Sequence, residues 1–223
     1  MLVTLGRFGF SPQMADLVQN AKSGFARKIV GLFSEADRKV SVEWWFRWWE
    51  FFYRGFFKYN LDVSGLFVPE SRKGFDCLLV LAEPAISQPL FDKSSEYFPC
   101  WKIYGGNLDE AVAEHERDPR KGAYAIWVED TQEPSKRLKN ISADKVREMK
   151  LATETLPERL LHGLVYHLGT GQHLDVENTT YCAGSRDYVG GIPSVRWDGG
   201  GLGVHGCPPS HAHDSLRPRE VVS

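Results

Sequence analysis

The spacing of hydrophobic and polar residues changes near residue 75 and divides the chain into two parts. Before this point the apolar residues follow helical spacing. Ser11 followed by Pro12 predicts a helix start, because the hydroxyl can accept an unpaired backbone N–H and Pro in the first turn loses no hydrogen bond. A second helix is predicted over residues 42–59. We therefore expect a helical N-terminal region over residues 1–75.

The helix predicted over residues 42–59 is unusually aromatic. Its charged residues recur every three or four positions and form one stripe, in which Glu43 and Arg47 are an i,i+4 pair. Aromatic residues cover the rest of its surface: Trp44, Trp45, Phe46, Trp48, Trp49, Phe51, Phe52, Phe56 and Phe57. A mostly buried helix is favoured over an interfacial membrane helix or a partner-binding surface, because a membrane-surface helix usually carries a Lys/Arg-rich polar face and here acids and bases balance.

From about residue 76 the pattern becomes one of short strands and isolated helices. Apolar runs predict strands at residues 77–82 and 123–128, and short helices are predicted after Asn107 and Ser142. Thr155 with Glu158 three residues later is a capping-box pattern that starts a further helix, which is expected to stop near Gly169. We therefore expect an α+β fold for residues 76–223.

After His173 the chain is rich in Gly, Ser, Asp and His, with only short strand candidates. These are residues 179–182, 194–197, 202–204 and 220–222. So little regular structure over about fifty residues is typical of long loops held by a scaffold, where binding residues are often found.

Composition excludes several classes of protein. A net charge of −2 argues against a broad nucleic-acid-binding surface, which needs an excess of basic residues. No apolar run is long enough to span a membrane, and no secretory signal is visible, so we expect a cytoplasmic protein, with display on a cell or virion surface left open. The four cysteines are far apart, which indicates free thiols rather than a disulfide framework.

The densest group of potentially reactive residues lies near the C-terminus. His205, Cys207, His211 and His213, with Asp214, could supply nitrogen and sulfur ligands to zinc. Their spacing matches no zinc motif, and we do not expect a metal or another cofactor. The sequence also lacks the G-x-S-x-G, P-loop, H-E-x-x-H and dinucleotide-binding motifs, so it indicates no enzyme.

Several short motifs in the second part resemble a known family. They are Phe98-Pro-Cys-Trp101, 122–128 (GAYAIWV), Leu160-Leu161, 170–175 (TGQHLD), 182–186 (CAGSR), 192–197 (IPSVRW) and 216–223 (LRPREVVS). Together they resemble the variable target proteins of diversity-generating retroelements, in which a reverse transcriptase miscopies the adenines of a template repeat. The resemblance implies a C-type-lectin-like domain of the formylglycine-generating-enzyme subclass, with short strands and long loops over residues 76–223.

The resemblance also implies a variable, ligand-facing surface at about residues 187–215. Asn codons mutated at their adenines cannot become Lys, Glu, Gln, Met or Trp, and residues 199–215 contain none of these five types. The expected variable residues are Tyr188, Val189, Ser194, Arg196, Asp198, His205, Gly206, Cys207, Ser210, His211, His213, Asp214 and Ser215. On this interpretation the His/Cys group is a sample of permitted codons rather than a metal site.

The sequence therefore predicts a non-enzymatic binding protein whose ligand is an unidentified protein or surface glycan. Leu202, Val204 and Trp197 are expected to pack the scaffold, and Arg186, Arg217 and Arg219 either to anchor its loops by hydrogen bonds or to be solvated. Two alternatives remain: an enzyme of the formylglycine-generating or sulfoxide-synthase superfamily, and a zinc-binding interaction module. A calcium-dependent sugar site is not expected, because Glu83-Pro84 lacks the following Asn. The oligomeric state is left open.

Overall fold

The computed structural model describes residues 41–223, and the helix predicted from Ser11 lies outside them. The described helices are α4 (Val42–Phe57), α5 (Ser87–Ser95), α6 (Leu108–Ala111), α7 (Ala143–Glu148) and α8 (Leu156–Thr170), with 3₁₀ turns at Pro119–Lys121 and Lys136–Leu138. The strands are β1 (Cys77–Leu81), β2 (Cys100–Lys102), β3 (Glu114–His115), β4 (Tyr124–Val128), β5 (Thr179–Tyr181), β6 (Ser185–Arg186), β7 (Ile192–Asp198), β8 (Gly201–Cys207), β9 (Leu216–Arg217) and β10 (Val221–Val222). The α+β class expected from the sequence is confirmed.

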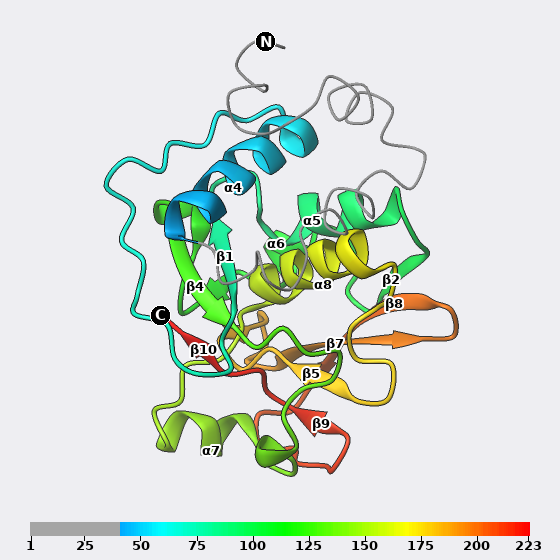
Figure 1. Cartoon of the computed structure of the whole chain (residues 1–223). Coiled ribbons are helices and arrows are strands. Elements are labelled where there is room, and N and C mark those ends of the chain that lie inside the picture. Colours follow the sequence, from blue (N-terminus) through cyan, green and yellow to red (C-terminus); the bar gives the residue numbers. More distant parts are fainter. Residues whose placement is uncertain (1–40) are drawn as a thin grey trace.

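Three sheets organise these strands (Figure 1). A three-stranded antiparallel sheet has the order β1-β4-β10, and a five-stranded sheet has the order β2-β8-β7-β5-β9. The β2–β8 and β5–β9 pairs of the larger sheet are parallel. A two-stranded pair, β3-β6, completes the described sheets. Most strands are short and long stretches of chain between them have no regular structure, as the sequence predicts.

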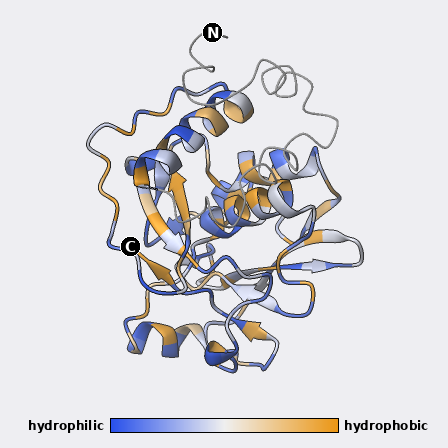
Figure 2. Ribbon diagram, in the orientation of Figure 1, coloured by the Kyte–Doolittle hydropathy of each residue, from blue (hydrophilic) through white to orange (hydrophobic). Residues whose placement is uncertain are grey.

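Helix α4 is attached to the first strand of the second part of the chain. Trp49, Phe52 and Tyr53 are buried, while the other aromatic side chains of α4 are partly buried. The Trp49 indole donates to Leu78 O at 2.9 Å, and the Tyr53 hydroxyl donates to Val80 O at 2.9 Å, both on β1. The helix thus contributes to the same hydrophobic core as β1, β4 and α8. The orange colour of β1, β4 and β10 in Figure 2 marks the strands that supply much of that core.

The helical region expected up to residue 75 ends earlier than predicted. Lys58 adopts a left-handed conformation with φ of 55° and closes α4 through a hydrogen bond from its N–H to Tyr53 O. Residues 58–76 contain turns and irregular chain, with neither helix nor strand. Gly65 and Gly74, both at positive φ, allow the chain to turn there and return to β1.

Helix α8 packs against both the three-stranded sheet and the five-stranded sheet. The predicted capping box is present: Thr155 Oγ1 accepts from the Glu158 N–H, and the Glu158 carboxylate accepts from the Thr155 N–H. The helix packs against α5, β1 and β7, and its leucines are buried in the common core. It therefore fixes the position of β7 relative to α4 and β1. No helix among residues 41–223 combines the length and apolar character that a membrane span requires.

Candidate functional site

The hairpin of β7 and β8 has two faces of different character. Along β7, Val195 points to the main core, and it lies opposite Val204 on β8. Arg196, the next residue, is opposite Gly203 and is partly exposed. Because side chains alternate across a strand, one face of this hairpin is core and the other is surface. The predicted packing of Leu202 and Val204 is confirmed, since both are buried in the core, and Trp197 packs against it.

Three of the expected variable residues lie on the open half of the outer face of this hairpin. They are Arg196 and Asp198 on β7 and His205 on β8. The Arg196 guanidinium lies 3.7 Å from the Asp198 carboxylate, and both side chains keep more than a third of their surface exposed. Burial, together with the charge of Arg196, lowers the pKa of His205. The outer face therefore presents a positive group, a negative group and an imidazole side by side.

Trp101 is part of this face, although its role was missed from the sequence. Strand β2 runs parallel to β8 with Trp101 opposite Gly203. A Cβ on Gly203 would lie 2.5 Å from the indole, so only glycine leaves room for the ring. The indole meets the His205 ring edge to face at a centroid distance of 4.4 Å and remains 41% exposed. Strand β2 has only three residues, too few for an alternating pattern to reveal in the sequence that Trp101 lies on this face.

Ser194 was expected on the variable surface, and this expectation is wrong. Its side chain has 1% of its surface exposed, and it lies between Tyr181 on β5 and His205 on β8. The half of the outer face near the start of β7 is covered by α7, which forms a second small core there. That core consists of Ala143, Val146, Tyr181, Ala183, Ile192 and Leu216, with Cys207 packed against it.

Cys207 lies at the border between the covered and open halves of the outer face. Its sulfur is 3.5 Å from the Ser194 hydroxyl, and it is partly buried. Burial raises the pKa of the thiol, so the site does not favour the thiolate. No disulfide joins the four cysteines, all of which lie within residues 41–223.

A tight turn at residues 187–191 projects two expected variable residues outward. Asp187 Oδ1 accepts from the N–H groups of Val189 and Gly191, which holds the turn closed. Tyr188 and Val189 then stand out, 77% and 76% exposed. The Tyr104 hydroxyl donates to Asp187 Oδ2 at 3.3 Å and lies close to the exposed Gly206, so this turn adjoins the end of β8.

The remaining expected residues lie in the loop after β8. Ser210, His211, His213 and Asp214 are exposed, and Ser215 is partly buried. His213 Nδ1 is 2.8 Å from the Ser215 hydroxyl, a local contact. Over residues 41–223, no three His, Cys, Asp or Glu side chains are grouped so as to hold a metal ion. The residues considered for zinc are therefore spread over the end of β8 and this loop.

The three arginines predicted as anchors do bind backbone carbonyls. Arg186 donates to Ala183 O and Ser185 O, and Arg217 donates to Asp214 O. Arg219 is 3% exposed and donates to the carbonyls of Thr131 and Gln132. This prediction is confirmed, and the alternative of solvated arginines is wrong for Arg219.

Arg219 also belongs to a buried ionic group that supports β7. Its guanidinium lies 2.6 Å from Asp175, whose other oxygen is 2.7 Å from Arg159. Burial opposes ionisation of Asp175, but the two guanidinium groups outweigh it and lower the pKa of the carboxyl. The Asp175 carbonyl accepts from the Trp197 N–H, which ties this group to the β7 backbone.

The site thus consists of an open sheet face, an adjoining turn and a loop, all carried by a framework that is buried and hydrogen-bonded. Its functional assignment depends on these residues alone, because neither a family model, nor a curated protein, nor a solved structure matches the chain.

Proposed function

We propose that this chain is a non-enzymatic ligand-binding protein that recognises a protein or surface glycan through the outer face of β2, β7 and β8 and the adjoining turn at residues 187–191. We further propose that the fold is of the C-type-lectin-like kind and that a retroelement diversifies this surface. The observation that carries the proposal is the alternation along β7 and β8. Buried Val195 and Val204 alternate with the partly exposed Arg196 and His205 on the same two strands.

This alternation separates the stability of the backbone from the identity of the outer side chains. Exposed substitutions away from special contacts usually change the free energy of unfolding by no more than about 0.5 kcal/mol, whereas core truncations cost several times more. Codons that yield many side chains can therefore vary at Arg196, Asp198 and His205 while Val195, Leu202 and Val204 hold the hairpin. A binding surface with such tolerance is what diversification requires.

The chemistry of the surface suits adaptable recognition. Tyr188 and Trp101 supply exposed aromatic rings, and Arg196, Asp198 and His205 supply charge and hydrogen bonding. Paratopes that must accept many ligands use the same mixture, because aromatic rings give contact area at low entropic cost and polar groups adapt. Trp101, fixed over Gly203, would be the constant element among variable neighbours.

A genomic comparison tests the diversification. We expect a reverse-transcriptase gene near this one, with a near-copy of the last hundred or so bases that differs almost only where the copy has adenine. The differing codons should include those of Tyr188, Arg196, Asp198 and His205, and should exclude that of the buried Ser194. A neighbourhood without such a repeat would refute diversification by a retroelement.

A pair of libraries tests the binding surface directly. The first randomises Tyr188, Arg196, Asp198 and His205, and the matched control library randomises Val195, Leu202 and Val204. We expect most members of the first library to be displayed folded and to yield binders against unrelated proteins or glycans, while most of the control library fails to fold. Equal loss of folding in both libraries would contradict the proposal.

A further inference from the structure

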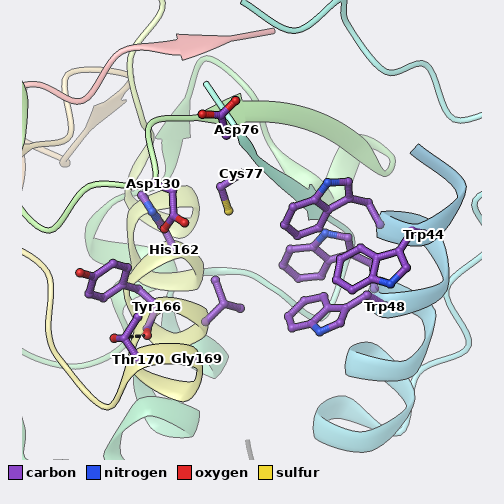
Figure 3. Close-up of a pocket in the computed structure, with 12 residues that line it drawn as sticks. Trp44, Trp48, Asp76, Cys77, Asp130, His162, Tyr166, Gly169 and Thr170 are labelled. Atoms are coloured by element: carbon purple, nitrogen blue, oxygen red, sulfur yellow. Dashed lines mark hydrogen bonds between the residues drawn. The ribbon is translucent and has the colours of Figure 1, made fainter. Parts of the chain in front are cut away.

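A pocket separate from the sheet face lies between α4 and α8 (Figure 3). It has a volume of about 90 Å³. A cavity that holds one water molecule needs only roughly 10–15 Å³. The described residues that line it are Trp44, Trp45, Trp48, Trp49, Asp76, Cys77, Asp130, His162, Val165, Tyr166, Gly169 and Thr170. The pocket can therefore hold a small organic group.

The two walls of the pocket differ in chemistry. Figure 3 shows indole rings of α4, including Trp44 and Trp48, along one wall, and His162, Tyr166 and Thr170 of α8 along the other. Trp48 meets the Trp45 and Trp49 rings edge to face, at centroid distances of 6.4 and 4.7 Å. An array of tryptophans presents electron-rich ring faces, which attract cations as well as apolar groups.

The polar wall contains a buried hydrogen-bonding atom with no partner in residues 41–223. His162 is 1% exposed, and its Nδ1 lies 2.7 Å from the buried Glu154 carboxylate. Because a carboxylate only accepts, Nδ1 is the nitrogen that donates to Glu154, and in the neutral form of the ring Nε2 presents a lone pair. Within the described chain that Nε2 has no hydrogen-bond partner. A buried acceptor of this kind is costly unless a ligand or water donates to it.

A carboxylate adds negative charge to the lining. Asp76 directly precedes β1, lines the pocket and is exposed. The pocket therefore combines a hydrogen-bond acceptor, aromatic faces and an acidic residue.

We propose that this pocket binds a small organic amine in its protonated form. Its N–H donates to His162 Nε2, and its alkyl or aryl part packs against the indoles of α4. A charge-assisted hydrogen bond and contact with ring faces both favour the ammonium form over a neutral ligand of the same shape. This site is distinct from the outer face of β2, β7 and β8, so either can exist without the other.

Titrations of the full 223-residue chain with butylammonium chloride, followed by NMR of the indole N–H groups, test the proposal. We expect saturable shifts of the Trp45 and Trp48 signals with a dissociation constant of about 1–10 mM, typical of a ligand with so few atoms. Single Trp→Phe variants assign the signals. 1-Butanol, which has the same length without charge, should bind at least about tenfold more weakly, with potassium chloride matching the ionic strength.

Two variants locate the interaction. His162→Phe removes the acceptor and should weaken butylammonium at least about tenfold, and should weaken 1-butanol less, because its neutral hydroxyl makes a weaker hydrogen bond. Trp45→Leu, in the half-buried aromatic wall, should weaken both probes and keeps the test valid if His162→Phe does not fold. Arg196→Ala on the sheet face is the matched control and should change neither titration. Equal affinity for the amine and the alcohol, or shifts confined to Trp101 and Trp197, would overturn the proposal.

Discussion

The two faces of the β7–β8 hairpin differ in what fixes them. On the inner face, Val195, Leu202 and Val204 pack into the core. The buried ion pairs of Asp175 with Arg159 and Arg219 are tied to β7 by the hydrogen bond from the Trp197 N–H to Asp175 O. The outer face carries Arg196, Asp198 and His205, whose contacts are largely with one another and with Trp101. One strand can therefore combine a fixed backbone with replaceable side chains, because the two sets of residues point in opposite directions.

The largest expected effect comes from the buried ionic group behind the inner face. Asp175→Asn removes the negative charge between Arg159 and Arg219 but keeps a residue that tolerates the φ of 60° at this position. Two buried guanidinium groups then lose the carboxylate that lies between them, so we expect the free energy of unfolding to fall by about 3–5 kcal/mol. Urea denaturation measures this change.

Asp198→Asn on the outer face is the matched control for Asp175→Asn. Asp198 is nearly half exposed and its ion pair with Arg196 is long, at 3.7 Å, so we expect a change within about 0.5 kcal/mol. Similar losses in the two variants would show that the outer face contributes to stability as the inner face does.

A smaller contrast is expected between two consecutive residues of β7. Val195→Ala removes two buried methyl groups and leaves a cavity, which should lower the free energy of unfolding by about 2 kcal/mol. Arg196→Ala should stay within about 0.5 kcal/mol because the side chain is partly exposed. Thermal unfolding of both variants, followed by circular dichroism, gives the comparison. A reversed order of the two losses would contradict the assignment of faces.

The smallest expected effect is a pH dependence that arises beside the inner face, because the titrating group, His173, is only partly buried and solvent screens its charge. His173 stacks on Trp197 with ring centroids 3.3 Å apart, and burial, aided by the nearby His167 and Arg159, lowers its pKa to about 4. The unfolded chain takes up this proton near pH 6.5 and the folded chain only near pH 4. Stability should therefore decline as the pH falls from 6.5 to 4, and this contribution should be constant above that range.

His173→Phe keeps a stacking ring but cannot titrate, so its unfolding free energy should fall less between pH 7 and pH 4.5 than that of the unchanged chain. Part of the decline should persist, because burial also lowers the pKa of His115 to about 4. Urea denaturation at the two pH values measures both declines. Parallel profiles for the variant and the unchanged chain would exclude His173 as a contributor.

Local signals in the sequence predicted individual elements well. The capping box at Thr155 and Glu158 depends on residues three apart, and the helix starts where predicted. The apolar runs at residues 77–82 and 123–128 correspond to β1 and β4. The end of α4 at Phe57 was missed because neither Pro nor Gly follows it, and the chain instead turns through the left-handed Lys58.

The site was predicted in part. Tyr188, Val189, Arg196, Asp198 and the residues of the following loop are exposed or partly exposed. Ser194 is not, because α7, about fifty residues earlier in the chain, covers its half of the sheet. Trp101 and the pocket between α4 and α8 were missed, since both depend on contacts between distant segments.

The sequence by itself determined the described helices other than α5, most strands and the polar character of the C-terminal surface, because these follow from side-chain spacing and from hydrogen bonds between neighbours. Only the tertiary structure decided which face of β7 is covered, that Trp101 lies over Gly203, and that the tryptophans of α4 meet His162. Such contacts depend on how separate elements pack, and packing is governed by the shape and burial of the whole chain rather than by any local pattern.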